Sequence, residues 1–247
     1  MSKIGIIALL MVAQSAWADF APVRAKIEAA MEAEVRTEQD RARDHNRMPI
    51  RTLEFFGLRD DMRALELLPG GGWYTKLLAP VLREKGALYL AIGGERLQGT
   101  LLKEAGFDKV KVTGEATLNR PEGGRFYDLQ TTGFGVDGLD IVFTFRNYHN
   151  LTPAGRAAMN EASFDALKSG GVYAVVDHTR RHMEGENNEN RRRIDPVLAI
   201  KEIQAAGFVF EDFSTLHYRA DDELRYEVGR RSVTGNTDRW TLKFRKP

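Results

Sequence analysis

Residues 66–75 read ELLPGGGWYT, a glycine-rich loop between two apolar segments that indicates the fold of the chain. It follows the apolar end of the run Ala64–Leu68 and leads into Tyr74–Arg83, where apolar residues recur at helical spacing. Strand, glycine loop and helix in this order are typical of a doubly wound α/β sheet, in which ligands lie outside the carboxyl ends of the strands. Consecutive glycines let the backbone approach such a ligand closely.

The glycine loop matches neither common nucleotide-binding fingerprint. In the pattern G-x-G-x-x-G the third glycine would fall on Thr75, and the Gly-Lys-Ser/Thr of a phosphate-binding P-loop is missing. A dinucleotide-dependent oxidoreductase is therefore disfavoured. The remaining signature is an acidic residue, Glu66, followed by Gly70, Gly71 and Gly72.

Strands and helices alternate along the rest of the chain. Short apolar runs predict strands at 87–92, 110–112, 141–145, 172–176, 208–213 and 240–244. Helical spacing predicts helices at 97–105, 153–167 and 195–206, with a turn at 168–171. This alternation implies a parallel sheet covered on both faces, a Rossmann-like α/β domain over 59–247.

The segment 19–58 is predicted to form a helical cap before this domain. Apolar residues at loosely helical spacing among many charges predict a surface helix over 21–43. Pro49 begins a shorter helix that ends at Gly57, because proline favours the first turn of a helix and glycine commonly closes one.

Residues 1–18, MSKIGIIALLMVAQSAWA, have the layout of a secretory signal peptide. One lysine precedes an apolar run, and Ala16-Trp17-Ala18 places small residues where a signal peptidase cleaves. The apolar run is shorter than the roughly 20 residues of a membrane-spanning helix. An uncleaved anchor or a buried first helix is the alternative. We predict cleavage before Asp19 and a periplasmic or secreted protein with no integral membrane segment.

The composition favours a small-molecule ligand. The 247 residues are 43% hydrophobic, which suffices for one substantial core. Lys and Arg number 36 against 35 Asp and Glu, so no net field attracts nucleic acid or an anionic membrane. The sequence has no cysteine, which excludes disulfides and thiolate chemistry.

Several stretches together resemble a family of exported class I S-adenosylmethionine-dependent methyltransferases. They are DRARDHNRMPIRTLEFFGL (40–58), ELLPGGGWYTKLLAPVL (66–82), LDIVFTFRNYHNL (139–151), LKSGGVYAVVDH (167–178) and TDRWTLKFRKP (237–247). The resemblance covers most of the chain from Asp40 to Pro247. It implies a seven-stranded sheet whose last strand runs antiparallel, S-adenosylmethionine as cofactor, and methyl transfer to an unidentified small-molecule acceptor.

The resemblance makes the glycine loop the cofactor site. Glu66 is expected to accept a hydrogen bond from the cofactor's amino group, directly or through water; the alternative is a structural carboxylate bonded to the loop's own amides. Family members usually carry an acid after the second strand for the ribose hydroxyls, and Glu95 is the candidate here. Trp73 and Tyr74 either wall the pocket or pack in the core. The predicted cofactor-binding residues are Glu66, Pro69, Gly70, Gly71, Gly72, Trp73, Tyr74, Glu95, Arg146 and Asn147.

Two polar clusters, 146–150 and 177–178, follow the strands predicted at 141–145 and 172–176. Both are expected at the carboxyl edge of the sheet, beside the glycine loop. A histidine there could remove a proton from a methyl acceptor near neutral pH, or it could satisfy a backbone group. The predicted catalytic residues are Tyr148, His149 and His178.

The polar loop 179–190 allows two interpretations, a mobile lid over the pocket or a solvated connection. His178 and His182 have the spacing of a metal-binding pair, with Glu184 nearby. Such a pair binds best on a firm helix, and this segment is predicted as a loop, so we predict no metal site.

Two functions remain open from the sequence. The first is a methyltransferase that uses S-adenosylmethionine. The second is an exported, non-catalytic small-molecule binding protein with the same fold, which export favours because the cofactor is made in the cytosol. Arg146 is expected either to clamp an acidic substrate or to pair with Asp177.

Overall fold

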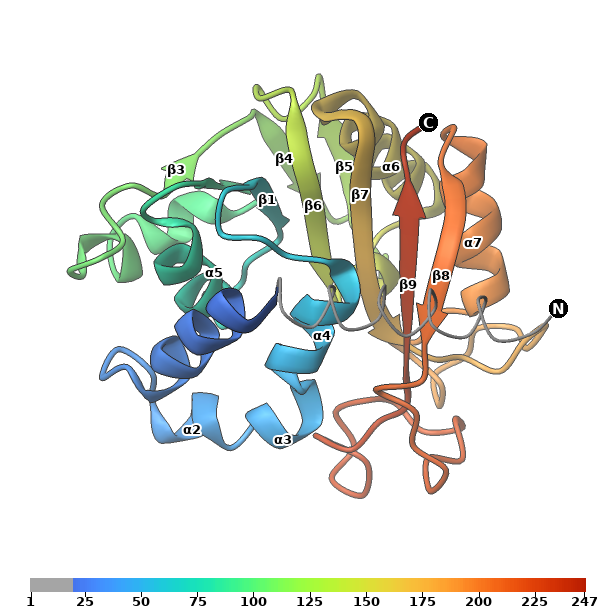
Figure 1. Cartoon of the computed structure of the whole chain (residues 1–247). Coiled ribbons are helices and arrows are strands. Elements are labelled where there is room, and N and C mark those ends of the chain that lie inside the picture. The colour runs from blue at the N-terminus through green and yellow to red at the C-terminus, as the bar shows by residue number, and fades with distance from the viewer. Residues whose placement is uncertain (1–19) are drawn as a thin grey trace, which may run out of the picture.

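One sheet organises the chain. In the computed structural model, which describes residues 20–247, seven strands pair in the order β3-β2-β1-β6-β7-β9-β8 (Figure 1). They are β1 Arg63–Leu67, β2 Ala87–Ala91, β3 Lys111–Val112, β6 Leu139–Phe145, β7 Leu167–His178, β8 Val209–Ser214 and β9 Arg239–Arg245. Neighbours from β3 to β7 are parallel, and β9 runs antiparallel to both β7 and β8. The predicted Rossmann-like sheet with an antiparallel last strand is confirmed.

Helices cover both faces of this sheet (Figure 1). Alternate residues of β6 point to opposite faces, so Phe143 joins a core with α4 (Pro49–Phe56) and α5 (Thr75–Leu82). Val142 joins a second core with α6 (Pro153–Ala166) and α7 (Pro196–Ala205). Burial on both faces explains why the central strands are almost continuously apolar.

The N-terminal segment is more broken than the sequence predicts. The predicted helix over 21–43 stops at residue 32, and two single-turn helices follow, α2 Glu38–Arg41 and α3 Asp44–Arg47. Thr37 starts α2 with a capping box, because its side chain accepts from the Asp40 amide while the Asp40 carboxylate accepts from the Thr37 amide. These short helices carry the chain across the carboxyl edge of the sheet.

Two further predictions are wrong in detail. The predicted helix at 97–105 is a pair of 3-10 turns, Gly94–Leu97 and Leu101–Lys103, separated by Gly99. Glycine weakens a helix interior, which accounts for the break. The predicted turn at 168–171 is drawn into the start of β7.

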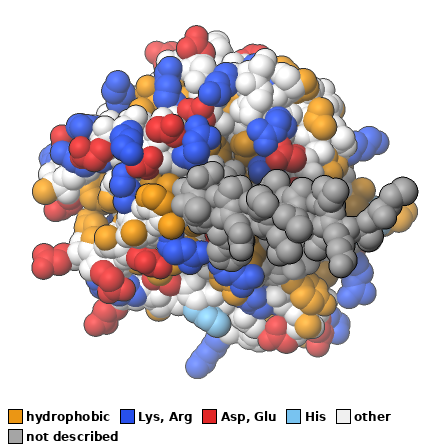
Figure 2. Space-filling view, viewed as in Figure 1, with side chains coloured by type: hydrophobic (Ala, Val, Ile, Leu, Met, Phe, Trp, Pro, Cys, Tyr) orange, Lys and Arg blue, Asp and Glu red, His pale blue; other side chains and the backbone are white. Residues whose placement is uncertain are grey.

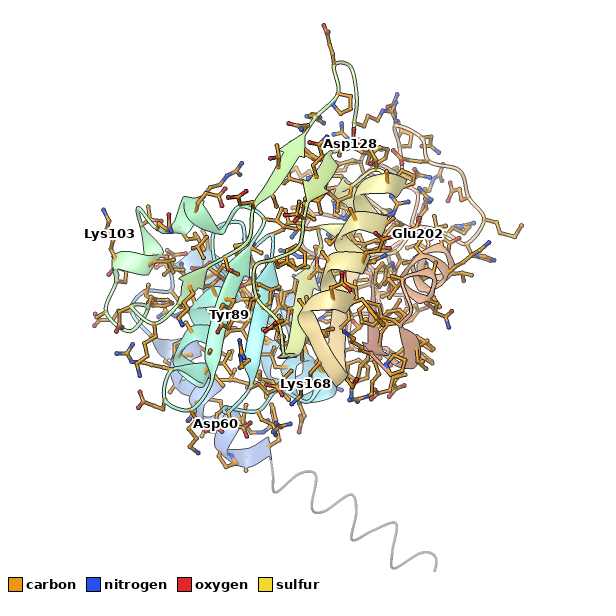
Figure 3. The ribbon with its side chains drawn as sticks, turned by 90° about the horizontal axis from the view of Figure 1, so that it is seen from above. Asp60, Tyr89, Lys103, Asp128, Lys168 and Glu202 are labelled. Carbon is orange, nitrogen blue, oxygen red and sulfur yellow. The ribbon has the colours of Figure 1, made fainter. Side chains whose placement is uncertain are left out.

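The sequence interpretation missed a β-hairpin, β4 Ala116–Asn119 and β5 Asp128–Thr131, which pairs outside the main sheet. It packs beside α6, where the Thr152 hydroxyl that caps the helix also donates to Asp128 at 2.6 Å. Asp128 is labelled beside that helix in Figure 3. Both strands are short and half polar, so their apolar pattern is weak.

The predicted signal peptide, 1–18, and Asp19 lie outside the described residues. Within 20–247, no helix is both long enough and apolar enough to cross a bilayer. The face seen in Figure 2 mixes acidic and basic side chains, in keeping with the near-zero net charge.

Candidate functional site

Backbone strain marks the carboxyl edge of the sheet. Leu68, Ile92 and Arg146 follow β1, β2 and β6, three adjacent strands, and their φ angles are 54°, 58° and 60°. A positive φ is uncommon outside glycine and a clear outlier for a β-branched isoleucine. Strain of this kind persists where the surrounding structure enforces it, frequently at functional sites.

The three glycines have different roles. Gly70 and Gly71 are exposed and border two cavities, and a Cβ built on either would have no atom within 4 Å. Gly72 is buried, and its Cβ would lie 2.5 Å from Leu101 Cδ2. The first two therefore leave room for a ligand. The third allows close packing of the chain, which differs from the expectation that all three face the ligand.

Glu66 lies beneath the loop, at the end of β1, and is 2% exposed. Its Oε2 accepts a hydrogen bond of 2.6 Å from the hydroxyl of Thr75, the residue that replaces the third glycine of the dinucleotide fingerprint. Burial raises the pKa of Glu66 to about 7, against the opposing effects of the Thr75 bond and the Arg47 charge. A cationic ligand group would favour the ionised carboxylate.

Glu66 faces a cavity of about 210 Å³ between the cap and the sheet edge. Of the predicted cofactor-binding residues, the cavity is lined by Glu66, Pro69, Gly70, Gly71, Trp73, Tyr74, Arg146 and Asn147. The Trp73 indole donates to the Asp40 carbonyl and so ties the cap to the glycine loop, whereas Tyr74 stacks on Phe145 at the end of β6. The Asn147 amide donates to the carbonyl of Leu68 and holds the loop in place.

Glu95 does not join these residues. It is exposed in the first 3-10 turn and borders neither cavity beside the glycines. Its neighbours Arg96 and Leu97 line the larger cavity, of about 1220 Å³, which also borders Gly70 and Gly71.

His149 and His178 share one buried carboxylate. Asp177 Oδ1 lies 2.5 Å from His149 Nδ1, and the Asp177 carboxylate also accepts from the backbone amides of both histidines. Because a carboxylate only accepts, the proton of this hydrogen bond is carried by Nδ1 of His149, and Nε2 is the ring nitrogen that can exchange a proton with a ligand. Both rings border a second cavity, and no hydrogen bond to His149 Nε2 is formed within residues 20–247.

His178 is poorly suited to act as a base. Burial lowers the pKa of His178 well below its ordinary value, and positive charge on His149, when that ring is protonated, and on Arg239 lowers it further. Its Nδ1 is 2.8 Å from the Thr237 hydroxyl. His178 is therefore neutral at physiological pH, and His149, oriented by Asp177, is the better candidate base.

The structure moves Tyr148 from the site into the core. Its side chain is fully buried, its hydroxyl donates to Glu202 at 2.9 Å, and the hydroxyl accepts from Asn160. Glu202 belongs to α7 on the far face of the sheet (labelled in Figure 3). The prediction of a catalytic Tyr148 is corrected, because a side chain three residues into a turn can point to either face.

The second cavity, about 460 Å³, contains residues that the sequence interpretation missed. Arg239 opens β9, and the antiparallel register places it directly opposite His178. Arg43 and Arg47 come from the broken N-terminal segment. Their clustering depends on chain reversals that single-sequence periodicity does not indicate, although DRARDHNR and TDRW both lie in stretches that carry the family resemblance.

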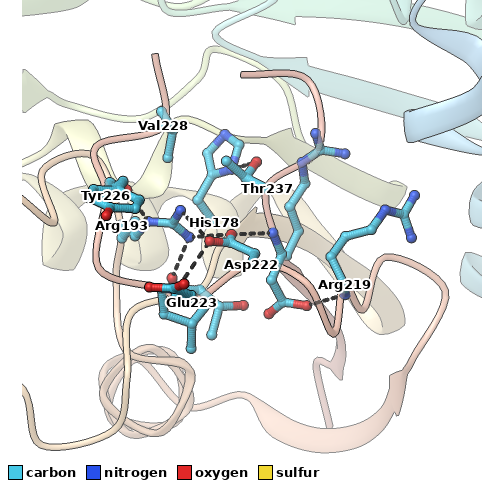
Figure 4. A network of polar contacts seen from close by, with 12 residues as sticks. His178, Arg193, Arg219, Asp222, Glu223, Tyr226, Val228 and Thr237 are labelled. Atoms are coloured by element: carbon cyan, nitrogen blue, oxygen red, sulfur yellow. Dashed lines mark hydrogen bonds and ion pairs between the residues drawn. The ribbon is translucent and has the colours of Figure 1, made fainter. Parts of the chain in front are cut away.

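One wall of this cavity is the C-terminal loop around 228–237, and it is held by a buried ion pair. Arg193 binds both oxygens of Asp222 at 2.8 and 2.9 Å, and Asp222 also accepts from the Asp238 amide (Figure 4). Breaking such a pair typically costs about 3–5 kcal/mol. The loop 179–190, considered as a lid, borders none of the cavities described above.

His178 and His182, which have the sequence spacing of a metal-binding pair, have different partners in the structure. His178 bonds Thr237, whereas His182 lies 2.9 Å from Asp195. In the part of the chain that the structure describes, no group of three or more His, Asp and Glu side chains is placed to hold a metal ion.

Solved structures match the fold over most of the chain. A S-adenosylmethionine-dependent methyltransferase from Aquifex aeolicus is 16% identical with a TM-score of 0.58, over 90% of this chain and 97% of that one. The cyclase SpnF is 15% identical with a TM-score of 0.56, over 82% and 80%. A chain from a Haloferax volcanii complex that contains the methyltransferase activator Trm112 is 14% identical with a TM-score of 0.54, over 93% and 96%.

The chain has the class I methyltransferase fold. No protein-family model matches it, and no curated protein does so by sequence. Sequence identities of 14–16% support a shared fold but not a shared reaction, so the function depends on the residues of the site.

The raised pKa of Glu66 predicts a pH-dependent stability. A carboxyl whose folded pKa lies above its unfolded value contributes stability that is fully present below about pH 4.5 and is lost as the pH rises through about 7. Glu66→Gln removes this titration. The difference in unfolding free energy, variant minus wild type, should increase by roughly 3 kcal/mol as the pH is raised from 4 to 8. Urea denaturation without ligand measures this difference. If the unfolding free energies of the wild type and of Glu66→Gln change in parallel with pH, Glu66 does not titrate in this range.

Proposed function

We propose that the protein is a S-adenosylmethionine-dependent methyltransferase. The observation that carries the proposal is the buried carboxylate of Glu66 at the end of β1, facing a cavity beneath the open backbone of Gly70 and Gly71. The Aquifex aeolicus structure with this fold is a S-adenosylmethionine-dependent methyltransferase, which supports the same conclusion.

The residues present fit the amino-acid end of this cofactor. Glu66 has the charge to bind the α-amino group, and its raised pKa is reversed by a nearby cation. A Cβ on Gly71 would project into space that contains no protein atom. Arg47 or Arg146, which border the same cavity, can bind the cofactor's carboxylate.

The larger cavity that also borders Gly70 and Gly71 is the candidate space for the nucleoside. Its apolar lining includes Leu97 and Leu101. Glu34 and Glu104 also border it, and they replace Glu95 as the carboxylates available to the ribose hydroxyls. We therefore propose no role for Glu95 in cofactor binding.

When bound, S-adenosylmethionine supplies an electrophilic methyl group on a sulfonium. The protein's own contribution is to position the acceptor and to remove its proton, for which His149 Nε2 is available and Asp177 stabilises the imidazolium. The acceptor atom gains the methyl carbon and loses its proton to His149. The electron pair of the carbon–sulfur bond that breaks stays on sulfur, so charge and atoms balance.

A non-catalytic binding protein is the second candidate. The displacement of Glu95 from both cavities favours it, because the usual ribose ligand is lost. The cyclase SpnF also has this fold, so the fold is not confined to methyl transfer. The paired His149 and Asp177 favour a reaction over binding alone.

Substitution of Gly71 tests cofactor binding without disturbing the fold. Gly71 has no left-handed φ and its Cβ direction is open, so Gly71→Val should retain the wild-type melting temperature. We expect its affinity for S-adenosylhomocysteine to fall at least tenfold in calorimetry, because the side chain fills the ligand's space. Gly185→Val, equally open and outside the cavities described here, is the matched control. Wild-type affinity in Gly71→Val, or no binding to the wild type, would defeat the proposal.

We also propose that the protein is exported. The proposal rests on the charged start, apolar run and Ala16-Trp17-Ala18 of the sequence. Intact-mass analysis of natively expressed protein from an osmotic-shock fraction should give a chain that begins at Asp19. Full-length protein confined to the cytosol would contradict export and would leave the proposed activity unaffected.

A further inference from the structure

The cavity beside His149 carries charge of one sign. Its volume is about 460 Å³, and its lining contains five arginines, two histidines and no Asp or Glu. The arginines are Arg43, Arg47, Arg146, Arg192 and Arg239. The face seen in Figure 2 mixes both signs, so the lining of this cavity differs in charge from that face.

Four of these arginines have no carboxylate partner in residues 20–247. Arg192 pairs with Glu227, but Arg43, Arg47, Arg146 and Arg239 form no ion pair there. Arg47 instead packs over Trp73, with its guanidinium carbon 4.3 Å from the ring centre. The buried Nε atoms of Arg146 and Arg239 have no hydrogen-bond partner.

This arrangement is costly without an anion. Arg47 and Arg239 are each 5% exposed. Burial and then the charge of Arg146 lower the pKa of Arg47 to about 9 and that of Arg239 to about 10. Both guanidinium groups remain protonated at neutral pH, so they repel each other in a poorly solvated space. A bound oxyanion would remove that repulsion and satisfy the open donors.

The cofactor does not supply the missing negative charge. S-adenosylmethionine carries an ammonium, a sulfonium and one carboxylate, so it brings one net positive charge. Glu66 can pair with the cofactor's ammonium group. The cofactor's carboxylate can pair with one of the arginines that border both cavities. Arg239 borders only the cavity beside His149 and would keep its charge unpaired.

We propose that this cavity binds the methyl acceptor and that the acceptor is a small molecule with at least two oxyanion groups, carboxylates or phosphates. The volume suits a metabolite-sized ligand and not a polymer. The arginine fork can bind two oxygens of either group at once. A hydroxyl of such a molecule held at His149 Nε2 loses its proton there as its oxygen bonds the methyl carbon. The assignment as acceptor rests on the proposed function, whereas anion binding does not.

Arg239 offers the sharpest test. We would measure binding of citrate, for carboxylates, and pyrophosphate, for phosphates, by calorimetry in sodium chloride of matched ionic strength. Loss of one charge-assisted contact predicts about tenfold weaker binding or more in Arg239→Gln, with partial recovery in Arg239→Lys. Arg245→Gln removes the same charge from the other end of β9, outside the cavity, and should bind like the wild type.

A second variant guards against misfolding of Arg239→Gln, since Arg239 also donates to the Asn46 carbonyl. Arg43 is exposed and forms no side-chain hydrogen bond within residues 20–247, so Arg43→Gln should fold and bind the anion more weakly. If neither anion binds the wild type more tightly than chloride, or if Arg239→Gln and Arg43→Gln bind like Arg245→Gln, the anion site is wrong.

Parallel titration with S-adenosylhomocysteine separates this inference from the proposed function. We expect Arg239→Gln to retain that affinity, because Arg239 does not border the cavity beside Glu66. Anion binding by a wild type that does not bind S-adenosylhomocysteine would uphold the anion site and overturn its assignment as the acceptor site. Binding of S-adenosylhomocysteine without any anion binding would uphold the proposed function and overturn the inference.

Discussion

The antiparallel pairing of β9 with β7 is the constraint on which the site depends. Because β9 enters the sheet in reverse, its first residue, Arg239, lies opposite His178 at the edge where the parallel strands end. The loop before β9 is thereby drawn over the same edge, where the ion pair between Arg193 and Asp222 holds it. A parallel last strand would place Arg239 at the opposite edge and leave the cavity without this wall.

Two adjacent cavities at this edge have opposite electrostatic requirements. Burial raises the pKa of Glu66, and a bound cation would stabilise its ionised form. The arginines around His149 would be stabilised by a bound anion. Arg47 and Arg146 border both spaces, so the two requirements meet at the same side chains. A cationic methyl donor and an anionic acceptor satisfy them together, which gives the two substrates a physical reason to bind side by side.

The sequence predicted the parts of the structure that depend on local pattern. Strong apolar runs located the central strands, and the Glu66 and glycine signature located the loop that borders the cavities. Local patterns failed where distant contacts decide the structure. Tyr148 turned toward Glu202, Glu95 stayed outside the cavities, and the first helix stopped at residue 32. Arg47 and Arg239 were missed because chain reversals and strand register, not their neighbours in sequence, bring them together.

The most direct measurement is a crystal structure of the full protein with S-adenosylhomocysteine. The account predicts that the ligand's amino group lies within hydrogen-bond distance of Glu66, that its amino-acid end passes beneath Gly70 and Gly71, and that its sulfur points toward the cavity containing His149 and Arg239. A ligand bound elsewhere, or one whose amino-acid end lies away from Glu66, would contradict it.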